Sequence, residues 1–534
     1  MAFGPGSPGG PPGQPPYQQV HPPRRRGLTV VAVTAVLALL VAGGAFAFYK
    51  TDPFQLFSAG PQAAQALPAD ALVYLSVDAD PSAKQKIDAV RFLNHFPYFK
   101  EHSGLVDENS DVRRSVMQKV LDAAGCSGVT YDDTVKPWLG QKFGVALMPR
   151  DESQTTNPVP VVAVEVTDEG QAKTGLGDLE ACSEGSDETG FGFAVENGYA
   201  LLAETQELAK RYADEASTSS LADNDAFNND IASLGELGVA TMWADVQGIV
   251  DSYGDTATDG LTPQSLGFLS STSGRAAATF RFASDHVEIA TSFHGDTTDI
   301  THSANQIVDL PESTVFAMSE SGGADRLKAS WDDLKNAMSS DGADVDKQLA
   351  DFEAQTGFAL PDDLETILGD NLMLSLDSEG LTTETLQAGD PALLNLGVRF
   401  TSDPSQLNSL YDKILALIQD QGGEDLSISK VDAADGMALA SNDSYASTLS
   451  GLDGTLGDSD VFRSVISDAA SKEFVLFFNW DAIEAQVTDA LRSDTGSPQS
   501  QQIADNLTAL SAMGVTAETD GDYTVSTFSI SVND

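Results

Sequence analysis

LPADALVY at residues 67–74 and LPESTVFA at residues 310–317 decide the fold, because two successive segments of the chain open in the same way. Each stretch begins with Leu-Pro, continues through an acidic turn and ends in an apolar run typical of a β-strand. Four further motif pairs follow in the same order: WLG at 138–140 with ILG at 367–369, GYALLA at 198–203 with GMALA at 436–440, DNDAF at 223–227 with DSDVF at 458–462, and residues 239–245 with 475–481. The spacing between copies drifts from 229 to 243 residues, as loop insertions produce. An internal repeat therefore predicts two lobes, and chance similarity of short apolar strings is the alternative.

Strand-like and helix-like runs interleave within each predicted lobe. Residues 276–282 and 287–293 have the pattern of a β-hairpin, and so do residues 515–519 and 523–532. Asp80, followed by Pro81, is expected to cap a helix that runs to about Leu93. The sequence thus predicts an α+β fold with two duplicated lobes, 67–304 and 305–534, each a mainly antiparallel sheet covered by helices.

An uncharged run of 22 residues, from Leu28 to Tyr49, precedes the lobes. Roughly 20 apolar residues in a helix suffice to cross the hydrocarbon core of a bilayer, so this run predicts a single transmembrane helix. The positive-inside bias places the N-terminus in the cytoplasm, because three arginines stand directly before the run: Arg24, Arg25 and Arg26. We expect a single-pass plasma-membrane protein with an extracytoplasmic C-terminal region. The alternative is a signal peptide cleaved near Ala45-Phe46-Ala47.

Two further segments flank the predicted membrane helix. Residues 1–27 are dominated by Pro, Gly and Gln and are expected to form a disordered cytoplasmic tail, because they hold too little apolar surface to fold. Residues 50–66 are expected to be a linker.

The charge of the chain excludes one class of partner. All 80 Asp and Glu residues follow residue 50, whereas only 25 of the 29 Lys and Arg residues do, so residues 51–534 carry a formal net charge of about −55. Such a surface repels polyanions, and nucleic acid is excluded as a ligand. Anionic lipid headgroups are disfavoured for the same reason, which leaves the anchor as the predicted contact with the membrane.

The chain holds two cysteines, Cys126 and Cys182. Both lie in the region expected outside the cytoplasm, where thiols oxidise, so a disulfide between them is predicted. Such a bond would stabilise the fold by roughly 2–4 kcal/mol. Two separate buried thiols are the alternative.

Motifs for metal binding or catalysis are missing from the sequence. The six histidines form no HExxH pattern, and no EF-hand loop is complete. The repeated acidic pairs end in Asp225 and Asp460, which are expected to cap the helices that follow, with the adjacent phenylalanines anchored in the core. The sequence therefore predicts no cofactor, no metal site and no catalytic residue.

The order of these features resembles a family of uncharacterised, single-pass envelope proteins of actinobacteria, defined by a domain of unknown function. The resemblance rests on the Pro-rich leader, the one span, LPADALVYLSVDAD at 67–80, FLNHFPYFK at 92–100, and the DNDAF and GYALLA segments. It covers most of residues 67–534. The resemblance implies a location and a fold more than an activity, since no catalytic residues are established for the family to carry over.

These observations favour a non-enzymatic binding or scaffold ectodomain on a membrane anchor. Its expected partner is an envelope protein, a wall component or a small apolar ligand held in a groove between the lobes. The alternative is an exported cell-wall hydrolase, which would bring buried carboxylates together in one pocket.

Overall fold

The computed structural model describes most of the chain beyond its N-terminal region. The described residues are 62–78, 83–102, 114, 117, 121, 128–149, 159–183, 191–253, 274–295, 300, 302–339, 344–420, 428–493 and 498–533. Residues 1–27, the predicted span from Leu28 to Tyr49, Arg24, Arg25, Arg26, Asp80 and Cys126 lie outside them. No helix in the described part has the length and hydrophobicity that crossing a bilayer requires.

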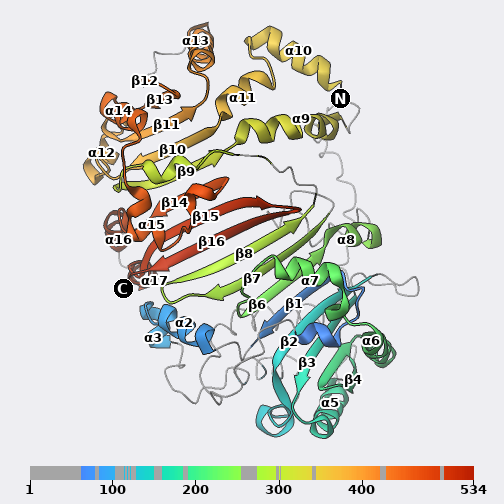
Figure 1. Cartoon of the computed structure of the whole chain (residues 1–534). Helices are drawn as coiled ribbons and strands as arrows, with labels where there is room; N and C mark the ends of the chain where they lie inside the picture. Colours follow the sequence, from blue (N-terminus) through green and yellow to red (C-terminus); the bar gives the residue numbers. More distant parts are fainter. Residues whose placement is uncertain are drawn as a thin grey trace, which may run out of the picture.

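Sixteen strands in the described part of the chain form one sheet, in which every neighbouring pair is antiparallel (Figure 1). The strands are β1 Val73–Asp78, β2 Leu139–Met148, β3 Val159–Val166, β4 Gly192–Glu196, β5 Tyr199–Ala203, β6 Ala240–Asp245, β7 Arg275–Phe282, β8 His286–His294, β9 Thr314–Ser321, β10 Asn371–Asp377, β11 Leu396–Thr401, β12 Ser429–Ala433, β13 Gly436–Ala440, β14 Phe474–Asn479, β15 Leu510–Asp520 and β16 Tyr523–Val532. The α+β class and the antiparallel pairing are confirmed.

The strand order is the same in the two halves of the sheet. From one edge to the centre the first half runs β4-β5-β3-β2-β1-β6-β7-β8, and from the other edge the second half runs β12-β13-β11-β10-β9-β14-β15-β16. In each half the residue two positions before the fourth motif bonds to the start of the first motif: the N–H of Leu221 donates to the carbonyl of Leu67 at 2.8 Å, and that of Leu456 to the carbonyl of Leu310 at 2.9 Å. The paired motifs therefore occupy matching places in the sheet.

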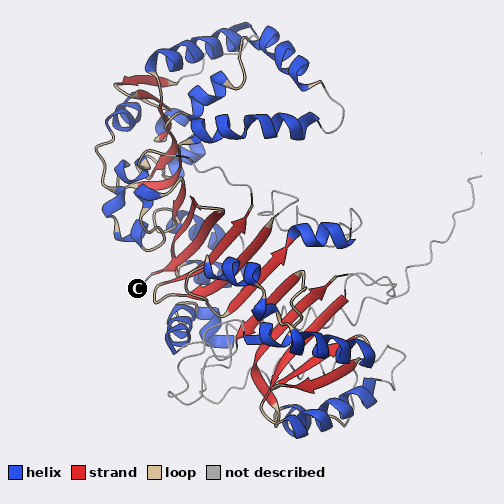
Figure 2. Ribbon diagram, turned by 45° about the vertical axis from the view of Figure 1, so that its right-hand side comes forward, coloured by secondary structure: helices blue, strands red, loops and turns tan. Residues whose placement is uncertain are grey.

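Strands β8 and β16 join the two halves. They pair over nine residues, from Tyr523 opposite His294 to Ser531 opposite His286. The prediction of a separate sheet in each lobe is therefore wrong. Figure 2 shows the strands continuing through the middle of the molecule as one twisted sheet.

Helices cover the two faces of this sheet. They are η1 Gln62–Ala66, α2 Ala83–Leu93, α3 Pro97–His102, η2 Tyr131–Val135, α5 Glu169–Ser183, α6 Gln206–Thr218, η3 Leu221–Asp223, α7 Asp225–Ala232, α8 Val246–Tyr253, η5 Gln306–Asp309, α9 Gly323–Ser339, α10 Val345–Thr356, α11 Asp362–Leu368, α12 Thr383–Ala388, η6 Pro391–Leu393, α13 Pro404–Asp420, α14 Asp443–Gly451, η7 Leu456–Asp458, α15 Asp460–Arg463, η8 Ala469–Ser471, α16 Glu484–Ser493 and α17 Pro498–Leu507. Helices α6, α7, α14 and α15 pack on one face, whereas α2 and α5 pack on the other.

Short helices precede the Leu-Pro motif in both halves. In the first half, residues 62–66 form η1, whose Ala63 and Ala64 are fully buried. A Cβ on Gly144 of β2 would come within 2.6 Å of the Ala63 Cβ, so only glycine admits this close packing. The predicted linker is therefore too long at its C-terminal end, because its small alanines belong to the core.

The helices after the acidic pairs begin as expected, but other residues cap them. Asn224, not Asp225, caps α7: its side chain accepts from the N–H groups of Ala226 (2.9 Å) and Phe227 (3.2 Å). Asp225 occupies the first turn instead, where a carboxylate complements the helix dipole. Asp460 likewise lies in the first turn of α15, one residue after the N-cap Ser459, and pairs with Arg463. The cap predictions for Asp225 and Asp460 are thus wrong by one residue.

The phenylalanines of both acidic motifs are buried as predicted, and they pack alike. Phe227 meets Trp243 of β6 edge to face at 5.5 Å, and Phe462 meets Phe477 of β14 at 4.9 Å. Three residues after each phenylalanine the halves differ, because the first has Asp230 and the second has Val465. The indole N–H of a buried tryptophan needs an acceptor, whereas phenylalanine needs none.

Asp230 is 1% exposed and provides the acceptor for the indole N–H of Trp243. Its carboxylate accepts from Trp243 Nε1 at 2.8 Å, from Arg275 Nε at 2.6 Å and from the hydroxyl of Tyr523 at 3.1 Å. Burial, followed by the charge of Asp230, raises the pKa of Tyr523, which keeps its hydroxyl protonated as a donor. Because Tyr523 belongs to β16, this network links the halves beside the central strand pair.

Cys182 lies in α5, where it packs against the buried apolar residues between this helix and the sheet and is disulfide-bonded. Because Cys126 is outside the described residues, the bond between Cys126 and Cys182 stays a prediction.

We predict that Asp230→Ala lowers the free energy of unfolding by about 2–4 kcal/mol, because it leaves a partly buried guanidinium and a buried indole N–H without an acceptor. Denaturant unfolding followed by tryptophan fluorescence measures the change. Asp225→Ala, on the exposed start of the same helix, is the matched control and should cost no more than about 1 kcal/mol. Equal losses in the two variants would contradict the assignment.

Candidate functional site

The two faces of the sheet differ in chemistry. Side chains of a strand alternate between the faces, and residues opposite each other in an antiparallel pair share a face. On the face under α6, α7, α14 and α15, many side chains of the middle strands are small or polar and are buried: Thr241, Thr279, Ser292, Ser319, Ser375 and Ser529. Helices can approach such a face closely.

The opposite face carries large apolar side chains in one unbroken row, which we call the apolar row. Strand register places its seven members opposite one another in succession, across both halves: Leu374, Met318, Leu476, Val515, Phe528, Ile289 and Phe280. Neighbouring strands lie about 4.8 Å apart, so the row extends over roughly 29 Å.

Every member of the apolar row is partly accessible to solvent. Ile289, in the central strand β8, is 39% exposed. Helices cover the flanks of this face: Phe92 of α2 packs against Phe282 at 6.0 Å, and Val246, at the start of α8, packs with Ala276 and Phe293. A long apolar surface that reaches solvent is unusual for the middle of a sheet and marks a candidate binding surface.

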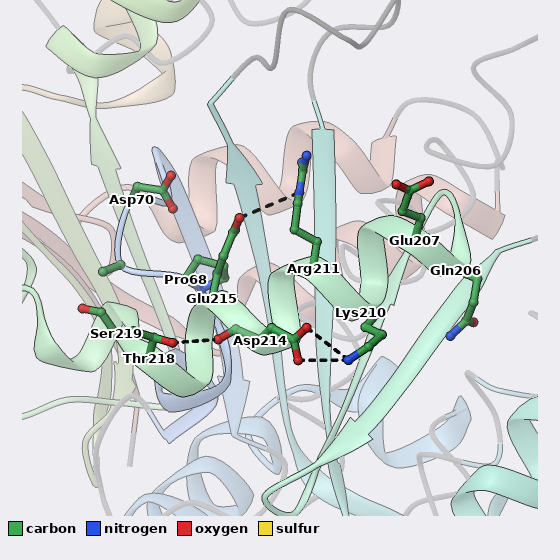
Figure 3. Close-up of a pocket in the computed structure, with 11 residues that line it drawn as sticks. Pro68, Asp70, Gln206, Glu207, Lys210, Arg211, Asp214, Glu215, Thr218 and Ser219 are labelled. Carbon is green, nitrogen blue, oxygen red and sulfur yellow. Dashed lines mark hydrogen bonds and ion pairs between the residues drawn. The ribbon is translucent and has the colours of Figure 1, made fainter.

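A second feature is the wide groove beside α6, of about 1090 Å³ (Figure 3). Four of its charged side chains pair along the helix, Lys210 with Asp214 at 3.1 Å and Arg211 with Glu215 at 3.8 Å. Such i,i+4 pairs are typical of an exposed helix surface.

A smaller recess of about 560 Å³ lies at the ends of β10 and β11 and is lined by five acidic residues: Asp362, Glu365, Asp370, Asp403 and Asp435. Several have structural roles. Asp403 accepts from the N–H of Gln406 at the start of α13 at 2.9 Å, and Asp435 pairs with the buried Arg399. No group of three or more His, Cys, Asp or Glu in the described residues is placed to hold a metal ion.

Buried carboxylates in the described part of the chain lie far apart in the fold and have separate partners. Asp377 accepts from Ser313 Oγ at 2.6 Å, Glu473 pairs with Arg326 at 2.8 Å, and Asp230 pairs with Arg275. Separate partners of this kind are typical of carboxylates with structural roles. These three buried carboxylates do not share a pocket.

The histidines lie apart in the same way. His286 and His294 stand at opposite ends of β8, where His286 contacts Asp285 at 2.9 Å and His294 packs on the ring of Tyr523 at 4.9 Å.

The apolar row was not predicted from the sequence. The sequence pattern that could have revealed the row is the alternation of large apolar residues with small or polar ones in strands such as β9 and β10. The sequence does not indicate which face of these strands the helices cover.

Comparisons with known proteins identify a family and little more. The model of DUF3352, described as a protein of unknown function, matches residues 30–376, which reach from the predicted membrane helix into β10. A search of curated proteins gives no match. A solved structure of TP0453, crystal form III, shares 11% identity over 46% of this chain and 83% of that chain, with a TM-score of 0.21. A likeness that weak carries no argument.

The family match spans more than half of the chain. The family resemblance expected from the motifs is thus confirmed at the level of the domain, whereas the actinobacterial source rests on that resemblance alone and the membrane anchor stays a prediction from the sequence. This chain belongs to the DUF3352 family of proteins of unknown function.

Proposed function

We propose that this protein is a non-enzymatic, membrane-anchored binding protein whose apolar row holds an elongated apolar molecule. The observation that carries the proposal is the row itself: seven large apolar side chains, aligned by strand register and all partly open to solvent. A ligand that removed about 200 Å² of apolar surface from water would gain roughly 5 kcal/mol before the costs of association.

Charge restricts the class of ligand. Residues 51–534 carry a formal net charge of about −55, so an anionic amphiphile would be repelled as it approached. A neutral or cationic apolar molecule fits both the row and the field around it. The row thus replaces the groove between lobes as the place where a small apolar ligand would bind.

The anchor and the repeat complete the proposal. The run from Leu28 to Tyr49 would hold the protein in the plasma membrane, with Arg24, Arg25 and Arg26 keeping the tail in the cytoplasm. The two halves would be copies of one ancestral segment, a proposal supported by their matching strand order and motif positions. The second half supplies five of the seven members and the first half supplies two, so joining the halves lengthens the row.

Ile289→Asn should weaken the binding of a neutral apolar fluorophore such as Nile red to the full chain by about tenfold. The substitution puts a polar side chain at the exposed centre of the row and removes about 1.4 kcal/mol of apolar contact. A fluorescence titration gives the dissociation constant. Ile503→Asn, on α17 and 53% exposed in the parent protein, is the matched control and should leave binding unchanged. Equal effects of both variants, or no binding at all, would refute the site.

Orientation is tested separately, in the cells that make the protein. With an epitope tag at the N-terminus, protease added outside intact cells should digest the region after residue 66 and leave the tag protected. Release of an untagged protein that begins near Ala47 would show a cleaved signal peptide instead. A protease-resistant C-terminal region in intact cells would reverse the proposed orientation.

A further inference from the structure

The two edges of the sheet are protected differently. At the β4 edge the side chain of Gln206 lies along the strand: the N–H of Phe193 donates to Gln206 Oε1 at 3.0 Å, and Gln206 Nε2 donates to the carbonyl of Phe193 at 2.8 Å. The amide thus takes the place of a neighbouring strand. Such blocking is one way in which proteins prevent edge strands from pairing with other chains.

The β12 edge is built alike but lacks this block. In both edge hairpins a two-residue turn joins the strands, so Lys430, the fourth residue before its turn, corresponds to Phe193, the fourth residue before the other turn. The backbone N–H and C=O of Lys430 and Asp432 therefore point away from β13. The residue that corresponds to Gln206 is Asp443, whose carboxylate accepts from Ser429 Oγ at 2.6 Å and reaches no backbone group of β12 in the described structure.

The solvent exposure of the two edge strands also differs. Gly192 and Val195 are buried on β4, whereas no residue of β12 is buried. The side chain of Asp432 is 58% exposed and pairs with Lys430 of the same strand at 3.2 Å. Ile428, which leads into β12, is 42% exposed. The unblocked edge is thus also the more open one.

The sequence of β12, Ser-Lys-Val-Asp-Ala, is self-complementary in an antiparallel pair. A strand added at this edge must set its outward-facing residues opposite Lys430 and Asp432. Two copies of β12 can do so in three registers: Lys430 opposite itself, Asp432 opposite itself, or Lys430 opposite Asp432. Like charges directly opposite each other destabilise a pair and unlike charges stabilise it, so charge selects the third register.

We propose that the β12 edge is a homodimer interface, with Val431 opposite Val431 of the partner subunit on a two-fold axis. Lys430 then lies opposite Asp432 of the partner subunit, and the reverse contact is equivalent. Each of these two residue pairs exchanges two backbone hydrogen bonds, and the sheets of the two copies become continuous. The proposal goes beyond ligand binding and is independent of it.

Cysteine crosslinking of the full chain tests the register. In the proposed dimer the two Val431 residues form a non-hydrogen-bonded pair, with Cα atoms about 4.5 Å apart, which lies within disulfide reach. Val431→Cys should therefore give a dimer on oxidation that is lost on reduction, with the bond mapped to residue 431. Ser429→Cys is the matched control, because its two copies lie four residues apart along the strand, about 13 Å, which is beyond disulfide reach.

Charge reversal in the Val431→Cys chain tests the contact that selects the register. Lys430→Glu should lower the yield of crosslinked dimer several-fold, and adding Asp432→Lys should restore it. Lys347→Glu, on the exposed surface of α10, should leave the yield unchanged. The proposal is overturned if Val431→Cys crosslinks no better than Ser429→Cys, or if the double reversal does not restore the dimer.

Discussion

Backbone pairing between β8 and β16 is the constraint on which the rest of the structure depends. Each half brings its own eight strands and its own hydrophobic clusters, and without this pairing each would end in a long unpaired strand. The nine residue pairs between β8 and β16 cover the free edge of each half. The buried carboxylate of Asp230, which accepts from Tyr523 of β16, holds the same junction from the helix-covered face.

One sheet with two unlike faces follows from that junction. On the helix-covered face, small residues let the helices approach: a Cβ on Gly514 of β15 would lie within 2.7 Å of the Val465 carbonyl oxygen. On the other face, large side chains from both halves align into the apolar row, which neither half could form alone. The proposed binding surface is therefore a product of the junction, and the unblocked β12 edge lies seven strands away from it.

Sequence predicted the parts that depend on local pattern. The alternation in residues 276–282 and 287–293 located the β7–β8 hairpin, and the paired motifs placed matching strands in both halves. Features that depend on contacts between residues distant in the sequence were not predicted. The pairing of β8 with β16 joins strands more than 200 residues apart, and nothing local marks either as an edge that will be covered. Sequence also could not tell whether Asn224 or Asp225 caps α7, because both residue types favour the N-cap and the helix boundary is not predicted to within one residue.

Hydrogen–deuterium exchange of the full chain tests the single continuous sheet most directly. If β8 and β16 pair, peptides covering residues 286–294 and 523–531 exchange as slowly as those covering β1 and β9 in the middle of each half. If the halves are separate, alternate amides of both strands face solvent, and these peptides exchange part of their amides as fast as surface turns do. That second result would contradict the junction, and with it the apolar row.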